Sequence, residues 1–249
     1  MKILLFSKRN SKEIIRDIAN LFFGLGFPII MLLLFTLINS ALPEEANNDM
    51  FSIDKIGPGI SAFGTAFFAL FAGILLAKDR TTSFLMRLFA SPMTSFDFIA
   101  GYTLPLLVMA LVQGCITFLA SATLGLPLTV TTPLAVLTQL PISFLYIGIG
   151  LLCGSFLSEK AVGGICGALL TNIGGWFSGV WIPLDLIGGA FKKTANILPF
   201  YHSVEAAKAA LNGSYKDILS HLAVVLIYAV IIYALAVFVF SRRMRDGKA

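Results

Sequence analysis

Few residues in this sequence are of types that carry out chemistry, and their spacing assembles no familiar reactive site. The three cysteines, Cys115, Cys153 and Cys166, form no Cys-x-x-Cys pair and are distant in sequence from the two histidines, His202 and His221. Zinc sites and disulfide frameworks place such residues at characteristic short spacings. We therefore expect no metal site and interpret the cysteines as small apolar packing residues.

Motifs for nucleotide and peptide hydrolysis are also missing from the sequence. The chain has no Gly-x-x-x-x-Gly-Lys-Ser/Thr loop to hold nucleotide phosphates and no His-Glu-x-x-His zinc motif. No acidic residue falls near the middle of an apolar stretch, where an intramembrane aspartate protease or an ion-coupled carrier would need one. We therefore expect no catalytic residue, no cofactor bound by this chain and no ATPase activity of its own.

The polar side chains inside the apolar stretches are uncharged. Apart from hydroxyl groups, those that lie away from the ends of the stretches are Gln113, Gln139 and Asn172. Amide side chains within a membrane commonly form hydrogen bonds between helices. For Gln113 and Asn172 this is the favoured role, and contact with a transported molecule is the alternative.

Long charge-free runs predict the transmembrane helices that position these polar side chains. Residues 98–158 contain no Asp, Glu, Lys or Arg over 61 positions, and four shorter runs flank them. A bilayer core about 30 Å thick needs ~20 apolar residues per helical crossing, so the long run holds two crossings. The runs do not alternate as barrel strands do. The sequence predicts an all-α integral membrane protein, one domain over residues 1–249, with six transmembrane helices. The predicted spans are residues 21–40, 57–77, 97–122, 134–157, 162–183 and 218–240.

Charge placement predicts the orientation of these spans. An even number of crossings puts both termini on one side, and 13 of the 18 Lys and Arg residues fall in segments on that side. Lys and Arg collect in cytoplasmic loops, so we expect both termini in the cytoplasm and the protein in a bacterial cell membrane. The chain is 57% hydrophobic and only 12% charged, which indicates lipid surroundings, so its net charge of +5 says little about nucleic acid. We expect no nucleic-acid partner.

The amino-terminal segment, residues 2–20, combines apolar and basic side chains at helical spacing. This pattern predicts an amphipathic helix lying on the inner membrane surface, with a solvated basic leader as the alternative. The side chains expected to share its apolar side are Leu4, Leu5, Ile14 and Ile18, and those expected to stay polar are Lys8, Arg9, Lys12 and Arg16.

The loop between the second and third spans is the most distinctive inner segment. A helix over residues 82–90 would carry an apolar ridge at four-residue spacing, and Pro92 would stop it. A ridge of this kind on a short loop must face either the lipid surface or a protein partner. It comprises Phe84, Leu85, Leu88 and Phe89, with Arg87 on its flank.

About 33 residues separate the fifth and sixth spans, and they are too apolar for an ordinary solvated loop. Pro183, Asp185, Gly188 and Gly189 interrupt the helix, and a stretch of small residues at 204–211 predicts a further helix. We predict short re-entrant helices that dip into the outer leaflet, as membranes allow where protein covers irregular backbone.

Glycine pairs four residues apart recur in the fourth and fifth spans. Such pairs let helix backbones approach closely. Packing within one chain is the favoured interpretation, and a subunit interface is the alternative. The pairs are Gly150 and Gly154, Gly163 and Gly167, and Gly175 and Gly179.

Two stretches of the sequence resemble the permease subunits of ABC-2 type transporters. The first, Arg87-Leu-Phe-Ala-Ser-Pro92, resembles the end of the family's inner helix, Arg-Leu-x-Ala-x-Pro. The second begins at Phe177-Ser-Gly-Val-Trp-Ile-Pro183 and resumes at Leu198-Pro-Phe-Tyr201, with residues 206–213 similar to the helix and glycine that follow. The order of these stretches, together with six spans and a basic amino-terminal helix, extends the resemblance over almost the whole chain.

The resemblance implies a half-transporter that acts as the membrane part of an exporter. The low charge of the expected path favours a hydrophobic or amphipathic cargo, such as a drug, peptide or lipid-linked molecule. The resemblance also implies a cytoplasmic ABC ATPase subunit that holds ATP and Mg²⁺, and a second permease copy or a related permease. The helix with Phe84, Leu85, Arg87, Leu88 and Phe89 would then be the ATPase-coupling helix. We place the substrate path at Asn172, Trp176 and Trp181 on the fifth span. For Trp181, the common role of an aromatic at the outer membrane interface is the alternative. A non-transporting scaffold or immunity-type protein and a passive channel are the alternatives.

Overall fold

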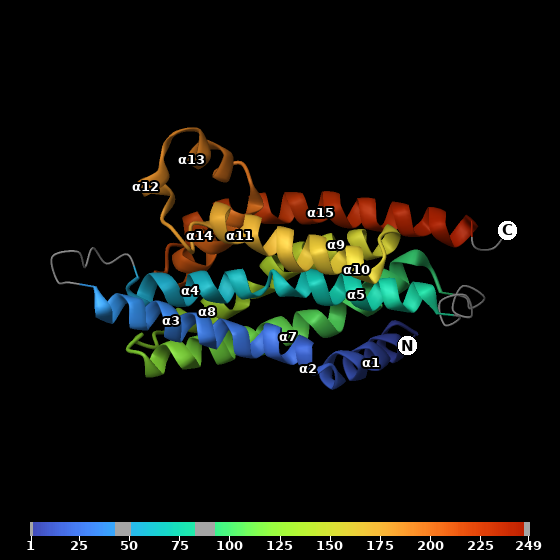
Figure 1. Ribbon diagram of the computed structural model, residues 1–249, viewed down its shortest axis with the longest axis horizontal. Coiled ribbons are helices and arrows are strands. Elements are labelled where there is room, and N and C mark those ends of the chain that lie inside the picture. The colour runs from blue at the N-terminus through green and yellow to red at the C-terminus, as the bar shows by residue number, and fades with distance from the viewer. Residues whose placement is uncertain (1, 43–50, 83–92, 247–249) are drawn as a thin grey trace.

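The computed structural model describes residues 2–42, 51–82 and 93–246, with the backbone alone for residues 243–246. Within these ranges the chain is helical and contains no strand. The helices run side by side in a long bundle, shown in Figure 1.

Six helical segments are long and apolar enough to cross a membrane, which confirms the predicted number. Their positions agree with the predicted spans to within a few residues, except at the end of the fifth. That helix ends at Ser178, because Gly179 adopts a φ of +77°, a left-handed conformation that glycine tolerates and that terminates helices. The six segments are Ile18–Ala41, Ile53–Thr81, Ser95–Thr123, Thr132–Phe156, Glu159–Ser178 and Tyr215–Arg242.

Most spans consist of more than one helical element, and η1 and η3 are π-helical turns. Helix α1 is Lys2–Arg16 and precedes the first span. The first span comprises α2 (Ile18–Leu21), η1 (Phe22–Gly26) and α3 (Phe27–Ala41). The second span comprises α4 (Ile53–Gly64) and α5 (Phe67–Thr81). The third span is the single helix α7 (Ser95–Thr123), and the fourth span comprises α8 (Thr132–Leu137) and α9 (Gln139–Phe156). The fifth span comprises α10 (Glu159–Val162), η3 (Gly163–Leu169) and α11 (Leu170–Ser178). Helices α12 (Leu184–Ile187), α13 (Gly189–Ala195) and α14 (Pro199–Leu211) precede α15 (Tyr215–Asp246), which holds the sixth span.

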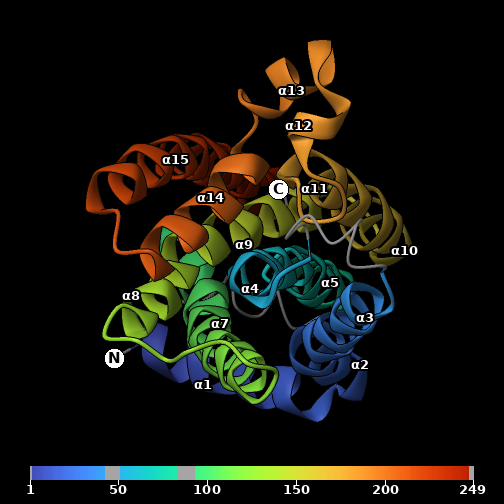
Figure 2. The same ribbon diagram turned by 90° about the vertical axis from the view of Figure 1, so that its left-hand side faces the viewer.

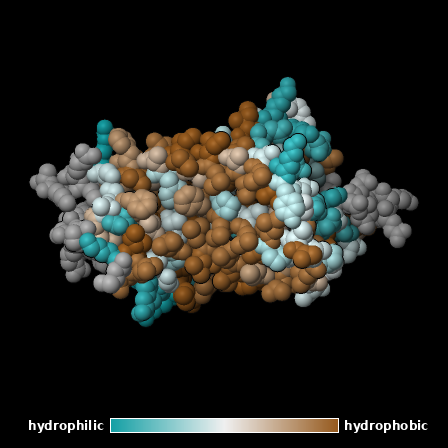
Figure 3. All heavy atoms as spheres, turned by 180° about the vertical axis from the view of Figure 1, so that it is seen from behind, coloured by the Kyte–Doolittle hydropathy of each residue, from teal (hydrophilic) through white to brown (hydrophobic). Residues whose placement is uncertain are grey.

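The second span occupies the centre of the bundle. The rest of the chain buries 89% of the most apolar stretch of the second span, whereas it buries 17% of the corresponding stretch of the sixth span. Figure 2 shows α4 and α5 surrounded by α3, α7, α9 and α11. On the face shown in Figure 3, apolar side chains form a hydrophobic band across the middle of the molecule, between two more hydrophilic ends. This distribution suits a bundle surrounded by lipid.

Both chain termini lie at one end of the bundle, which we call the termini end (Figure 1). The opposite end carries residues 184–198, including α12 and α13, which we call the arm because they project away from the bundle (Figure 2). The predicted short helices between the last two spans are therefore confirmed, although α14 begins at Pro199 and not near residue 204. Their dip into a lipid leaflet stays a prediction.

Glycines bring α5 and α9 into direct backbone contact. A Cβ at Gly150 would lie 2.0 Å from the carbonyl oxygen of Ala69, and one at Gly154 would lie 2.5 Å from that of Gly73. The predicted role of this pair in packing within one chain is confirmed. At Gly163, by contrast, no described atom outside its own helix lies within 4 Å of the Cβ position, so this glycine does not serve close packing within the chain.

The interpretation of the cysteines as packing residues holds for only part of the set. Cys166 is buried between the fifth span and its neighbours. Cys115 is exposed on α7, so the expected packing role was wrong for that residue.

Candidate functional site

The residues on either side of the predicted coupling helix show how that segment is attached to the bundle. Helix α5 ends at Thr81, just before it, and α7 begins just after it. Thr94 caps α7: its hydroxyl accepts the Asp97 N–H at 3.2 Å, and the Asp97 carboxylate accepts the Thr94 N–H at 2.8 Å. This reciprocal cap fixes the entry into the third span. The predicted coupling residues Phe84, Leu85, Arg87, Leu88 and Phe89 themselves lie outside the described residues.

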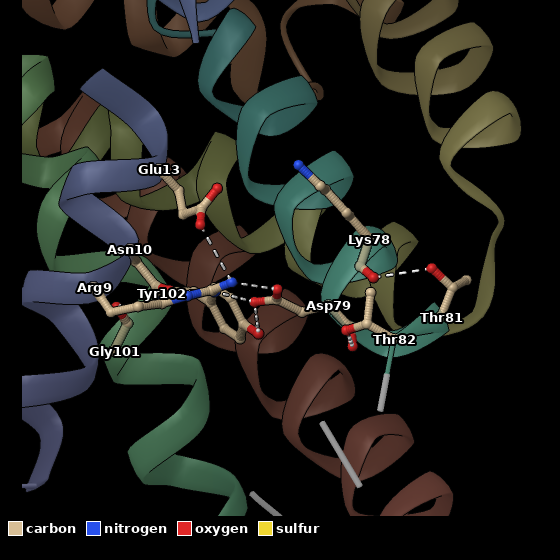
Figure 4. A network of polar contacts seen from close by, with 9 residues as sticks. All are labelled: Arg9, Asn10, Glu13, Lys78, Asp79, Thr81, Thr82, Gly101 and Tyr102. Atoms are coloured by element: carbon tan, nitrogen blue, oxygen red, sulfur yellow. Dashed lines mark hydrogen bonds and ion pairs between the residues drawn. The ribbon is translucent and has the colours of Figure 1, made fainter. Parts of the chain in front are cut away.

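Asp79, in the last turn of α5, is the centre of a polar network that joins three helices (Figure 4). Its carboxylate accepts two hydrogen bonds from the Arg9 guanidinium on α1, one of them between Nη2 and Oδ1 at 2.7 Å. The Tyr102 hydroxyl on α7 donates to Asp79 Oδ2 at 2.9 Å. With only 3% of Asp79 exposed, the ion pair lies largely inside the protein.

The charge of Arg9 is maintained in this setting. Burial of the guanidinium opposes its charge, but the hydrogen bond and the negative charge of Asp79 outweigh this effect and raise the pKa of Arg9 above its ordinary value. A bidentate Arg–carboxylate pair is strong and directional. Removing one partner of such a pair leaves the other charge poorly solvated, so the network holds α1 firmly against the end of α5.

Helix α1 is also packed along α7. The Phe6 ring contacts Phe98 and Tyr102 edge-on, with ring centroids 5.7 and 5.0 Å apart. The Asn10 side-chain amide donates to the Gly101 carbonyl at 3.0 Å. A Cβ at Gly101 would lie 2.3 Å from Phe6, so only glycine permits this approach. These contacts bury one face of α1 against the third span.

The predicted helix at the amino terminus is confirmed, but its predicted apolar side was wrong. Ile14 is buried, together with Phe6 and Asn10. Leu4, Leu5 and Ile18 are exposed, with Ile18 beyond the end of α1. The reason is tertiary: the buried face is the one from which Arg9 and Asn10 can reach α5 and α7.

Arg80, next to Asp79, attaches the end of α5 to the fourth span on the other side. Its guanidinium donates to the carbonyl oxygens of Ser155 and Leu157, the latter at 2.7 Å. These carbonyls lie at the carboxyl end of α9, where helix backbone acceptors lack partners within the helix. Two adjacent residues therefore connect the start of the 83–92 segment to α1, α7 and α9.

The second span is interrupted near its middle, and Gln113 compensates for the interruption. Between α4 and α5 the Thr65 N–H bonds to Ala62 O instead of continuing the α-helical pattern, which frees the carbonyl of Ser61. The Gln113 amide on α7 donates to this carbonyl at 3.2 Å. Gln113 is fully buried, so its predicted interhelical hydrogen bond is confirmed.

Asn172 behaves differently from this prediction. It is exposed on α11, and its amide donates to Ala168 O of its own helix at 2.8 Å. The favoured interhelical bond was therefore wrong for Asn172. Because its amide already has a local acceptor, Asn172 needs no neighbouring helix to satisfy it.

The two tryptophans predicted on the substrate path lie in contact with each other. Trp176 is one helical turn after Asn172 and 43% exposed, and its ring meets Trp181 edge-on at a centroid distance of 5.6 Å. Trp181 also packs on Phe63 of the second span, and a Cβ at Gly175 would lie 2.5 Å from its ring. The structure thus brings Asn172, Trp176 and Trp181 to one side of the fifth span, with Trp181 reaching inward.

The two histidines, far apart in sequence, meet in the structure. Their Nδ1 atoms are 2.8 Å apart, which joins α14 to the start of α15, and His202 Nε2 lies 2.9 Å from Asn196 O. In the described part of the chain, no group of three or more His, Cys, Asp or Glu side chains is arranged to hold a metal ion.

The Asp79 network is the feature of this end of the bundle that the sequence analysis did not predict. The available signal was a carboxylate between Lys78 and Arg80, at the end of an apolar span on the predominantly basic side of the membrane. A lone acid in such a position invites a search for an internal cationic partner. Its partner, Arg9, is 70 positions away and could not be identified without the fold.

A family model described as "ABC-2 type transporter" matches residues 1–212 of the chain, which covers the first five spans and α14. No curated protein matches the chain.

Proposed function

Because this chain belongs to the ABC-2 type transporter family, whose membrane domains are non-catalytic, we propose that it is one membrane half of an ATP-driven exporter. A separate cytoplasmic ABC ATPase binds ATP and Mg²⁺ in this proposal, and a second permease copy or a related permease completes the membrane part. The termini end then faces the cytoplasm, as the bias of Lys and Arg favours.

The observation that carries this mechanism is the attachment of the 83–92 segment. Asp79 and Arg80 connect its start to α1, α7 and α9, and the Thr94 cap fixes its end. A force applied to the segment would therefore act on several spans together. This is the property that a coupling element needs if closure of an ATPase pair is to move the spans as rigid bodies.

The strength of the proposed ATPase contact can be bounded. Burying Phe84, Leu85, Leu88 and Phe89 would contribute about 6–12 kcal/mol at ~1.5–3 kcal/mol each. Association costs about 4–15 kcal/mol, so this contact alone is marginal. Exposed side chains of α1 lie at the same end and would add to the contact; they are Leu4, Leu5, Lys8, Lys12 and Arg16. Pairing of two permeases would double the whole attachment.

The proposed cargo is hydrophobic or amphipathic. The side of the fifth span with Asn172, Trp176 and Trp181 offers one amide and two indole rings, with Ile165 and Leu169 exposed nearby. A face with so little charge suits an apolar molecule with few polar groups. We place it beside the seam between two permeases, where a path would be shared by both copies.

The test is to replace Phe84 and Leu88 with Asp and to measure co-purification of the ATPase and ATP-dependent transport. We expect both to be lost, because two carboxylates cannot be buried in an apolar contact. Val130→Asp is the matched control, since Val130 is 98% exposed in the loop between α7 and α8, away from the 83–92 segment in the sequence and outside the arm. Unchanged association and transport would refute the coupling role, and conduction without ATP would support a channel instead.

A further inference from the structure

A cavity of about 650 Å³ lies at the arm end of the bundle. Its walls come from the start of α4, the segment that leads into the arm, one side of α14 and the first turns of α15, elements that can be followed in Figure 2. Cavities of this size accommodate drug-sized organic molecules. In the orientation proposed above, this cavity is on the side of the membrane opposite the ATPase.

The lining is partly apolar. Ile56, Val180 and Leu184 contribute side chains from α4, the chain after α11 and α12. Ile56 and Leu184 are only 6% and 5% exposed, so they are held in place by the surrounding protein. A ligand of this cavity therefore needs an apolar part.

Charged side chains line the remainder, and two of the lysines among them are already neutralised on their own walls. Lys192 pairs with Asp185 within the arm, and Lys208 pairs with Glu205 at 2.9 Å within α14. The hydrogen bond and charge of Asp185 raise the pKa of Lys192, so Lys192 keeps its charge at neutral pH. The third lysine, Lys55, also has an interaction partner.

Two further carboxylates of the lining form no ion pair with a described residue. Asp54 on α4 and Asp217 on α15 are exposed, and neither has an ion-pair partner among the residues that the structure describes. They belong to different walls of the cavity. His221 lines the cavity one turn after Asp217, on the same helix.

Tyr201, from the α14 wall, adds an aromatic ring to these acidic walls. Burial and the charge of Glu205 raise the pKa of Tyr201, so its ring remains an uncharged phenol. Carboxylates combined with an aromatic face and apolar surface are the features that recognise quaternary and other organic ammonium groups.

We propose that this cavity is a binding site for an organic ammonium ion with an apolar substituent. Asp54 and Asp217 face the positive group from two walls, Tyr201 contacts it with its ring, and Ile56, Val180 and Leu184 contact the apolar part. This site is separate from the side of the fifth span proposed for cargo, and the inference goes beyond the permease assignment.

The probe is benzyltrimethylammonium, titrated at pH 8 onto the full chain in nonionic maltoside micelles and followed by saturation-transfer NMR. We expect saturable binding of this cation and no saturable binding of benzenesulfonate, an anion of similar size. Asp54→Asn and Asp217→Asn should each weaken binding about fivefold, and the double variant more than either. Tyr201→Leu should also weaken it, whereas Tyr201→Phe should not.

Glu159→Gln is the matched control, because it removes one carboxylate from the first turn of α10, at the start of the fifth span and outside the cavity lining. It should leave binding unchanged. Absence of saturable cation binding, equal binding of benzenesulfonate, or normal binding by the double variant would each overturn the proposal. The chain is measured without ATPase or ATP, so this outcome is independent of the coupling test.

Discussion

Arg9 and Asp79, 70 positions apart, form a bidentate ion pair that attaches the amino-terminal helix α1 to the last turn of the second span. The pair is one residue away from Arg80, which binds the end of α9. An amphipathic helix and a buried span thus share one anchor at the base of the 83–92 segment. At this end of the bundle, charge-assisted hydrogen bonds of Arg9 and Arg80 therefore hold α1, α5 and α9 together.

Asp79→Asn should release α1 from the bundle. The change removes the charge that compensates Arg9, and because Arg9 is partly exposed we expect a loss of about 2–3 kcal/mol in the free energy of unfolding. Faster amide hydrogen exchange in residues 2–16, together with a lower thermal unfolding midpoint, would report it. Glu13→Gln is the control, since Glu13 is 3.7 Å from Arg9 and partly exposed. Equal effects of both substitutions would contradict the role of the buried pair.

Arg80→Gln should loosen the carboxyl end of α9. Hydrogen bonds from a charged donor contribute about 1.5–3 kcal/mol, and this residue donates to both Ser155 O and Leu157 O. We expect faster hydrogen exchange in peptides covering residues 150–158. Lys78→Gln removes a positive charge two positions earlier from an exposed side chain and should have no such effect. If exchange in this region is the same in both variants, the carbonyl contacts do not stabilise α9.

Gly150→Ala should separate the second and fourth spans. Its Cβ would lie 2.0 Å from Ala69 O, and backbone at that distance can yield only if α5 and α9 move apart. Overpacking of this kind costs about 1–3 kcal/mol or more. Gly164→Ala introduces the same methyl group where no described atom lies within 4 Å, and should be neutral or stabilising by up to ~1 kcal/mol. Thermal unfolding of the two variants distinguishes these outcomes, and comparable destabilisation would contradict the close contact.

The spans were predictable because a charge-free run long enough to cross a bilayer has few alternatives. The approximate ends of α7 and α15, for example, follow from the charges that flank each run. Gln113 was also predictable in kind, since a buried amide in a membrane must find a partner. Which backbone carbonyl it would find was not, because that depends on an interruption of the second span near Thr65.

The predictions failed where one helix could use more than one face. The apolar residues of α1 surround much of its circumference, and Arg9 and Asn10 decided the buried side through partners on α5 and α7. Asn172 failed for a related reason: its own helix offered an acceptor at Ala168, so no neighbouring helix was required. Periodicity indicates that a helix has a preferred side, whereas the partners that select it come from distant segments.

Gln113→Leu should destabilise the middle of the bundle. The Ser61 carbonyl would lose its donor in a fully buried position, at a cost of about 0.6–2 kcal/mol. Asn172→Leu removes a similar amide from an exposed position on α11 and should change stability by less than ~0.5 kcal/mol. Thermal unfolding in the same detergent compares the two. A larger effect at Asn172 would show that Gln113 does not compensate for the break.

Trp176→Ala should change which cargo is preferred without impairing the fold. The ring is 43% exposed on the side of α11 that also carries Asn172, and its inner edge contacts Trp181, so a cargo on this side would meet the indole directly. Loss of an aromatic contact of ~1 kcal/mol would alter the transport ratio of a large and a small apolar cargo about fivefold. Leu219→Ala, which truncates a side chain 71% exposed on α15, is the control and should leave the ratio unchanged. Since transport is measured for two cargoes in the same vesicles, a uniform loss of activity is separated from a change in preference. An unaltered ratio in Trp176→Ala and in the Asn172→Leu variant would exclude this face from the substrate path.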